Sequence, residues 1–199
     1  MAFAVSEFKT NLKGGGARPS LFTVDIDAAL KQLGIAPPIS SKFLIKGASI
    51  PTSTIGTYDV FYHGKAIHVA GDRSFETWDT TIINDEDFGI RIAIEKWMDL
   101  VADHKLNSRQ LNNSEGETAS YKKSIKVTQF SKTGEHLHHY HFLGAFPTTL
   151  SAIALDWATA SEIEEYTVTW TYDRWMPGTS AKGPLTTVDH LLSTEKHTA

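Results

Sequence analysis

The amino-acid sequence predicts a mainly β fold, in which two packed antiparallel sheets form a sandwich or barrel beside one α-helix over about residues 85–105. Two observations predict this class. Runs of alternating apolar and polar residues, the spacing of strands, recur along most of the chain. Apolar residues at helical spacing occur in one long segment, so one helix accompanies many strands.

The first half of the chain holds a glycine-rich loop and several extended segments. Gly14, Gly15 and Gly16 relax the backbone in front of the first predicted strand. In “TYDVFYHGKAIHV”, His63 and Gly64 separate two strand-like runs, and this two-residue spacing is typical of a tight hairpin. Strands are expected at residues 21–26, 43–45 and 74–83, with a hairpin that turns at His63-Gly64.

The predicted helix follows an acidic start. Asn84 can accept a backbone hydrogen bond as the N-cap, and the carboxylates of residues 85–87 suit the positive end of the helix dipole. Behind them, an apolar face is formed by Ile90, Ile94, Trp97 and Val101. We expect Trp97 to pack this face onto a sheet.

The second half returns to strands. “SIKVTQF” alternates, and “EHLHHYHFLGAF” is extended and closed by Pro147. “IEEYTVTWTYDRW” is the clearest strand, because one face carries Tyr166, Val168, Trp170 and Tyr172 and the other carries Thr167, Thr169 and Thr171. The aromatic face is expected to be core, and the threonine face suits water, a neighbouring subunit or a lumen.

Composition bounds the class of protein. The 199 residues predict one domain over 1–176, with a C-terminal extension over 177–199. A formal charge of -4 argues against tight, non-specific DNA binding. The chain has no cysteine, no long apolar run and no secretory signal, so we expect a soluble protein that is made in a cytoplasm and binds no membrane.

No catalytic constellation emerges from the residues. The sequence has no HExxH motif and no Gly-x-Ser-x-Gly elbow, and “KGGGARPS” lacks the spacing of a phosphate-binding loop. Glu164 and Glu165 are adjacent on a strand, so they face opposite sides and cannot easily act on one substrate. We therefore predict no catalytic residue, no enzyme and no cofactor.

Four histidines lie within six residues, at His136, His138, His139 and His141. Imidazoles two residues apart on a strand can chelate a transition metal, but a catalytic site usually needs a third ligand. The favoured interpretation is a histidine-rich strand near the surface, with no metal, and a metal site at these four residues is the alternative.

Several segments, in the right order, resemble one family. “LGAFPTTLSAIALDWATASEIEEYTVTWTYDRW” is similar to the C-terminal half of tail tube proteins from contractile-tailed bacteriophages. The pattern covers Gly144 to Pro147, Asp156-Trp157 and Ile163 to Trp175. “GGGARPSLFTVDI”, “FLIKGASIPTSTIG” and “WDTTIINDEDFGIRIAIEKWMDLV” resemble earlier parts of the family. The likeness runs from about Val5 to Trp175; the histidine-rich strand and the tail after Pro177 depart from it.

The resemblance implies a structural protein of the virion tail, assembled in the host cytoplasm. Proteins of that family form hexameric rings that stack into a hollow conduit for genome ejection, inside a contractile sheath. Besides the sheath protein, the implied partners are further copies of the chain, the baseplate and tail terminator proteins, the tape measure protein and the double-stranded DNA that passes through.

The resemblance also suggests which residues meet neighbours. Contacts between rings are expected at Arg18 and at Gly47, Ala48, Ser49, Ile50 and Pro51. Thr167, Thr169 and Thr171 are the candidates for a face toward the lumen or another subunit. The alternatives left open are the tube protein of a related contractile injection device, such as a tailocin or a secretion system, and a histidine-rich metal-binding protein.

Overall fold

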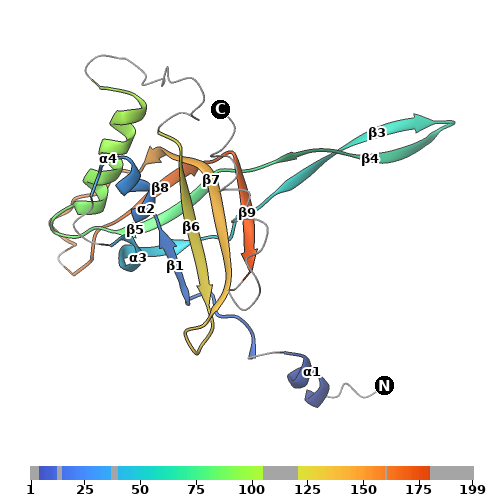
Figure 1. Cartoon of the computed structure of the whole chain (residues 1–199), viewed down its shortest axis with the longest axis horizontal. Helices are drawn as coiled ribbons and strands as arrows, with labels where there is room; N and C mark the ends of the chain where they lie inside the picture. Colours follow the sequence, from blue (N-terminus) through green and yellow to red (C-terminus); the bar gives the residue numbers. More distant parts are fainter. Residues whose placement is uncertain (1–4, 13–14, 37–39, 105–120, 160, 180–199) are drawn as a thin grey trace, which may run out of the picture.

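A computed structural model describes residues 5–12, 15–36, 40–104, 121–159 and 161–179, and shows a layered β body from which a long hairpin projects (Figure 1). The strands are β1 Phe22–Asp25, β2 Ile45–Ala48, β3 Thr54–Tyr62, β4 Lys65–Ser74, β5 Trp78–Ile83, β6 Lys123–Phe130, β7 His136–Leu150, β8 Glu165–Thr171 and β9 Arg174–Thr179. The helices are α1 Val5–Asn11, α2 Asp27–Gln32, α3 Ser41–Leu44 and α4 Gly89–Val101.

The mainly β prediction is confirmed, and all the strand pairs are antiparallel. One half of the body has the order β1-β6-β7-β9, and the other has the order β2-β5-β8-β7. We call these halves sheet A and sheet B. They share β7, which pairs with β6 and β9 along its first part and with β8 along its last part. The hairpin β3–β4 forms a separate two-stranded sheet.

The “GAFP” segment is the place where β7 passes from one sheet to the other. Gly144 has φ 68°, and a Cβ there would collide with the carboxylate of Asp173, so a larger residue would be strained and would displace that side chain. The register with β8 shifts between Pro147 and Thr149, where the proline has no N–H to donate. The expectation that the strand closes at Pro147 is wrong, because β7 bends there and continues to Leu150.

The core between the sheets and α4 is rich in aromatic rings. Trp78 stacks on Phe142 with 4.3 Å between ring centroids, and Trp97 of α4 meets Trp170 of β8 at 5.5 Å. All four rings are buried. The Trp97 indole donates a hydrogen bond of 2.8 Å to the carbonyl of Tyr121, which satisfies its one polar atom. The expected packing of α4 through Trp97 is confirmed.

The helix starts later than its sequence predicts. α4 begins at Gly89, because Phe88 has φ 53° and interrupts the helical backbone. The side chain that caps it is Asp85, whose Oδ1 accepts a hydrogen bond of 3.1 Å from the Gly89 N–H. The predicted cap, Asn84, instead donates from Nδ2 to Glu164 over 2.8 Å. α4 ends at Val101, and residue 105 of the predicted span lies outside the described residues.

A cluster of hydrogen bonds around Asp27 joins α2 to α3. Asp27 accepts hydrogen bonds from the Ser41 N–H at 2.9 Å and from the Ser40 hydroxyl at 2.5 Å, and the Ile26 N–H donates to the buried Ser41 hydroxyl at 3.3 Å. Burial raises the pKa of the Asp27 carboxyl, but these hydrogen bonds and the nearby Lys42 outweigh it and hold that pKa below its ordinary value.

The C-terminal part of the body is β9, which reaches Thr179 and so takes in the first residues of the expected 177–199 extension. Residues 180–199 lie outside the described part of the chain. Within the described residues, no helix has the length and apolar character needed to cross a membrane.

Candidate assembly surfaces

The β3–β4 hairpin, residues 54–74, stands clear of the body, and we call it the arm (Figure 1). Its two strands are in register from Thr54↔Ser74 to Tyr62↔Lys65, with a shift near Gly56. His63 and Gly64 turn the chain with φ 46° and 79°, as a two-residue hairpin loop requires. The predicted hairpin and its turn are confirmed, but the sequence did not indicate that the hairpin leaves the body.

The arm is amphipathic, although both of its faces are exposed. Residues directly opposite on paired strands share a face, so one face carries Tyr58, Val60, Tyr62 and Ile67. The other face carries the hydrogen-bonded pair Asp59 and His68, with Phe61 nearer the turn. An isolated two-stranded ribbon is only marginally stable in water. An apolar face on such a ribbon is therefore typical of a segment that another protein surface covers.

Indole hydrogen bonds fix the root of the arm. Trp78 donates from Nε1 to the carbonyl of Ser49 over 2.8 Å, and Trp175 donates to the carbonyl of Thr52 over 2.9 Å. Pro51 between them is buried. These bonds set the direction in which the arm leaves the body.

The candidate inter-ring residues fall on this root and beside it. Gly47 and Ala48 belong to β2 and pair with β5, whereas Ile50 is half exposed. A groove of 280 Å³ brings the 48–50 segment together with the residue after Arg18. The lining residues are Pro19, Phe22, Ala48, Ser49, Ile50, Val127, Gln129 and Tyr140. Two segments that the sequence analysis singled out separately thus share one largely apolar surface.

The threonine face lies on the outer side of sheet B. Thr167, Thr169 and Thr171 are partly exposed, while the alternate residues of β8 are buried, as the alternation predicts. In the paired register, Thr81 lies opposite Thr167 and Asp79 lies opposite Thr169. The outer surface of sheet B is therefore polar, and mostly hydroxyl-bearing around β8.

Sheet B also has two edges to which no described strand is bonded. β2 pairs only with β5, and the last part of β7, residues 146–150, pairs only with β8. Unpaired edges present rows of N–H and C=O groups that another strand can satisfy.

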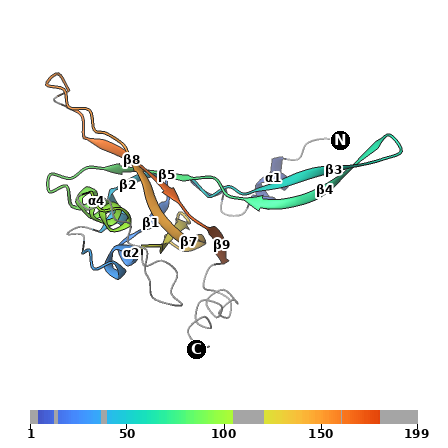
Figure 2. The same ribbon diagram turned by 90° about the horizontal axis from the view of Figure 1, so that it is seen from above.

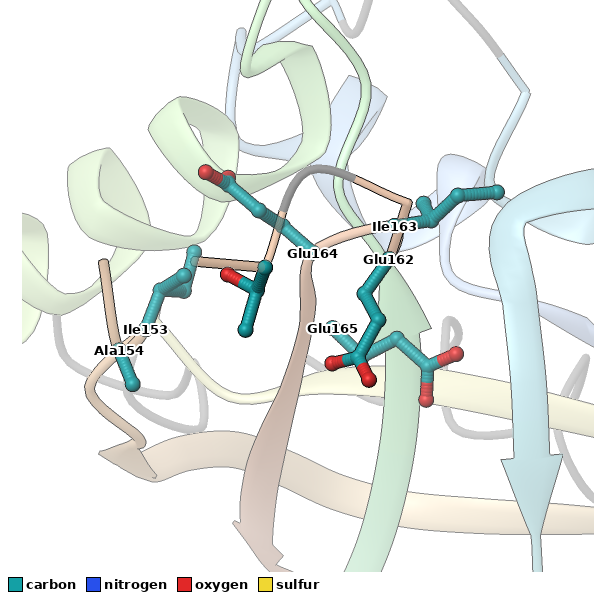
Figure 3. Close-up of a pocket in the computed structure, with 7 residues that line it drawn as sticks. Ile153, Ala154, Glu162, Ile163, Glu164 and Glu165 are labelled. Carbon is teal, nitrogen blue, oxygen red and sulfur yellow. The ribbon is translucent and has the colours of Figure 1, made fainter. Parts of the chain in front are cut away.

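A second exposed apolar surface lies on the loop between β7 and β8, residues 151–164, which we call the β7–β8 loop. Trp157 is fully exposed at 102%, and Leu155 and Ile163 are exposed at 82% and 70%. At the base of this loop is a pocket of 460 Å³ (Figure 3). Glu162 and Glu165 extend toward the same side of the pocket, and Glu164 points toward α4. The pocket is acidic and open to the surface.

Comparison with known proteins identifies the family to which a chain with these surfaces belongs. The sequence profile of the family described as “Phage tail tube protein” matches residues 17–177. The chain belongs to the phage tail tube protein family. The resemblance drawn from the sequence motifs is confirmed, and the chain is a structural subunit of a phage tail tube.

Individual relatives agree with this assignment. The tail tube protein gp19 of Enterobacteria phage T4 is 29% identical over 163 residues, which cover 81% of this chain and 92% of gp19. The gp19 protein of Enterobacteria phage T6 is 28% identical, with the same coverage. Both relatives are tail tube proteins.

Solved structures share the fold of this tail tube protein. The tube-terminating cap of the anti-feeding prophage superposes with a TM-score of 0.59 at 19% identity, over 83% of this chain and 92% of that one. The sheath/tube terminator of the extracellular contractile injection system PVC gives a TM-score of 0.56 at 18% identity, over 82% and 97%. At these identities the likeness shows a common fold.

The histidine-rich strand is one feature of this tail tube protein that the family pattern does not explain. The ring centroids of His139 and His141 are 5.0 Å apart, and those of His138 and Tyr140 are 4.7 Å apart. The ring of His136 contacts Phe130. In the described part of the chain, no group of three or more metal-ligating side chains comes together. The metal alternative therefore stays without a third ligand from these residues.

Two surfaces of the tail tube protein were missed by the sequence analysis. The length of the arm was not predicted, because Tyr58, Val60 and Ile67 are residues that a core strand would also use. Trp157 was seen only as part of a family motif. Its position between Asp156 and a small-residue stretch, rather than in an alternating run, is the signal that could have marked it as exposed.

Proposed function

We propose that the chain forms hexameric rings that stack into a hollow tail tube, through which double-stranded DNA is ejected and around which a contractile sheath closes. The observation that supports this most directly is sheet B, with its two unbonded edges and its polar outer face. Edge pairing between neighbours would join six copies of sheet B into a closed barrel, and closure removes exposed edges.

In this arrangement, the threonine face of sheet B lines the bore. Thr167, Thr169 and Thr171 carry hydroxyl groups without charge, so they offer phosphate no cation to bind. The overall charge of -4 acts in the same direction. DNA can then pass along the wall without being held by it. No part of this role requires a catalytic residue, and we propose that the chain is not an enzyme and needs no cofactor.

Contacts between rings are assigned to the arm and its root. The root includes the candidate residues Gly47 to Pro51, and the apolar groove beside it lies next to Arg18. The ends of the stack would meet baseplate and tail terminator proteins, and the bore would hold the tape measure protein before DNA enters. The mature location is the tail of the virion, after assembly in the host cytoplasm.

Electron microscopy tests the proposal. The purified chain is imaged in negative stain at rising concentration, in low-salt and high-salt buffer. Hollow rings or tubes of uniform width are expected, with sixfold symmetry in end-on views. A monomer under every condition, or rings of another order, would contradict the proposed assembly.

A related contractile injection device is the second candidate, because the solved structures that share the fold come from such systems. The chain would have the same tube role there. The genes beside this one distinguish the two: a phage locus also encodes capsid, portal and terminase proteins, whereas a tailocin or secretion locus lacks them.

A further inference from the structure

The arm and the β7–β8 loop leave opposite ends of sheet B. In the pairing of β5 with β8, Trp78↔Trp170 lies at the end where the arm begins, and Ile83↔Glu165 lies at the end where the loop begins. Figure 2 shows the arm and the loop that precedes β8 extending in opposite directions. A second copy displaced along these strands therefore brings its arm toward the β7–β8 loop of the first.

The loop presents an anchor that is already held in place. The Ala158 N–H donates to Asp156 Oδ1 over 2.9 Å, and the Thr159 hydroxyl donates to the Asp156 carbonyl over 2.8 Å. This turn carries Trp157 at its exposed tip. A tryptophan held in a fixed turn loses little conformational entropy on binding, and tryptophan is enriched among residues that dominate protein interfaces.

The tip of the arm has the matching apolar side chains. Val60 and Tyr62, which share the apolar face near the end of β3, are exposed at 46% and 67%. The arm on which they lie stands clear of the body (Figure 2). Both surfaces expose large apolar side chains to water, so contact between them would remove apolar area from solvent on each side.

The charges of the two surfaces are also complementary. The arm tip carries Lys65, and the pocket under the loop is lined by Glu162, Glu164 and Glu165. Glu165 already binds Lys46, and Glu164 binds Asn84. Among the residues that the structure describes, neither Lys65 nor Glu162 has an ion-pair partner. The pocket thus offers one open carboxylate to an incoming cation.

We propose that the arm tip, Val60 to Lys65, of one copy docks on the β7–β8 loop of a second copy in the adjacent ring. Val60 and Tyr62 pack against Trp157 and its apolar neighbours, and Lys65, which lies opposite Tyr62 on the same face, pairs with Glu162. The proposal rests on the proposed function, because it requires stacked copies. The contact is head-to-tail, so every copy gives an arm and receives one, and the contact repeats along the stack without closing.

Disulfide trapping tests the contact, since the natural chain has no cysteine. Ile67→Cys, on the same face of the arm as Tyr62 and Lys65, is combined with Ala158→Cys on the loop, and assembled material seen in the microscope is oxidised. A non-reducing gel is expected to show a ladder that continues beyond six chains. The matched control combines Ile67→Cys with Lys96→Cys on the exposed side of α4, and it should give no ladder.

Every alternative outcome of the trapping experiment would overturn a particular part of the inference. Tubes without a ladder would overturn the arm–loop contact and leave the proposed function standing. A ladder that stops at six chains would place the contact within one ring. A ladder from Ile67→Cys with Gln129→Cys instead would place the arm in the apolar groove. Failure of the parent chain to form rings or tubes would contradict the proposed function itself.

Charge reversal tests the ion pair separately. Lys65→Glu and Glu162→Lys are each expected to raise the concentration needed for tube formation by about tenfold, because the weakened contact is repeated around every ring. The double variant Lys65→Glu with Glu162→Lys should return it to near the parent value. Both positions are exposed, so circular dichroism should show a parent-like fold. Single variants that polymerise as the parent does would overturn the pairing.

Discussion

Trp175 of β9 donates a hydrogen bond from its indole nitrogen to the carbonyl of Thr52, over 2.9 Å and across 123 residues of sequence. The bond connects a strand of sheet A to the root of the arm. Trp78 makes the equivalent bond to Ser49 from sheet B. Both sheets therefore hold the arm, and its direction is a property of the whole body rather than of a local turn.

Replacing Trp175 by phenylalanine should loosen the arm without unfolding the body. The ring contact with Tyr140 is largely kept, while one hydrogen bond is lost, with a loss of about 1 kcal/mol in unfolding free energy. We expect a melting temperature within a few degrees of the parent, but fewer and shorter tubes in sedimentation and electron microscopy. Tubes as long as those of the parent would show that this bond does not position the arm.

Trp97 and Trp157 form a matched pair of substitutions. Trp97 is buried against Trp170, so Trp97→Ala should lower the unfolding free energy by about 3–5 kcal/mol. Trp157 is fully exposed, so Trp157→Ala should leave the stability of the monomer unchanged and impair assembly instead. Chemical denaturation of the two variants measures the difference. Similar melting of Trp97→Ala and the parent would contradict the packing of α4.

The sequence predicted elements best where local pattern and burial coincide. The alternation from Tyr166 to Tyr172 predicts β8 because every second residue is in the core. The spacing at His63-Gly64 predicts the hairpin because the turn needs positive φ at both residues. These features depend on neighbours in sequence, so the sequence alone reveals them.

Local sequence patterns do not predict the structure where distant contacts decide it. Gly144 and Pro147 look like the end of a strand, but Asp173 and β8 hold β7 through the bend. The apolar pattern of the arm does not tell which surface covers it, and a partner chain can do so as well as a core. Helix α4 starts late because Phe88 takes a positive φ, which its identity does not predict.

Acid should weaken the cluster of hydrogen bonds around Asp27. Because its pKa is lowered in the folded chain, the carboxylate contributes stability that is fully present above its unfolded pKa of 3.8 and is lost as pH falls through the lower folded value. Asp27→Asn should therefore destabilise the chain by about 1 kcal/mol at neutral pH, through weaker hydrogen bonds. The difference from the parent should shrink below pH 3.8.

Urea unfolding of the parent and Asp27→Asn at a series of pH values measures how the difference in their unfolding free energies changes with pH. The control is Asp72→Asn, at an exposed position on β4, which should follow the parent at every pH. A constant difference between Asp27→Asn and the parent from neutral to acid pH would show that charge at Asp27 plays no part.

The proposed bore predicts a size-dependent reactivity at the threonine face. Thr169→Cys introduces a single thiol on the outer side of sheet B, and Lys96→Cys places one on the exposed side of α4. In the monomer, both thiols should react with a small maleimide, and with one carrying a long polyethylene glycol chain. In assembled tubes, Thr169→Cys should still react with the small reagent but should be protected by at least about tenfold from the long one, since the polymer loses conformational entropy in a narrow channel.

Lys96→Cys is the control, and it should react with both reagents in both states because the proposal places α4 away from the bore. Equal protection of the two thiols from the long reagent would remove the support for a threonine-lined lumen, and protection of Thr169→Cys from both reagents would place this face in a subunit contact instead.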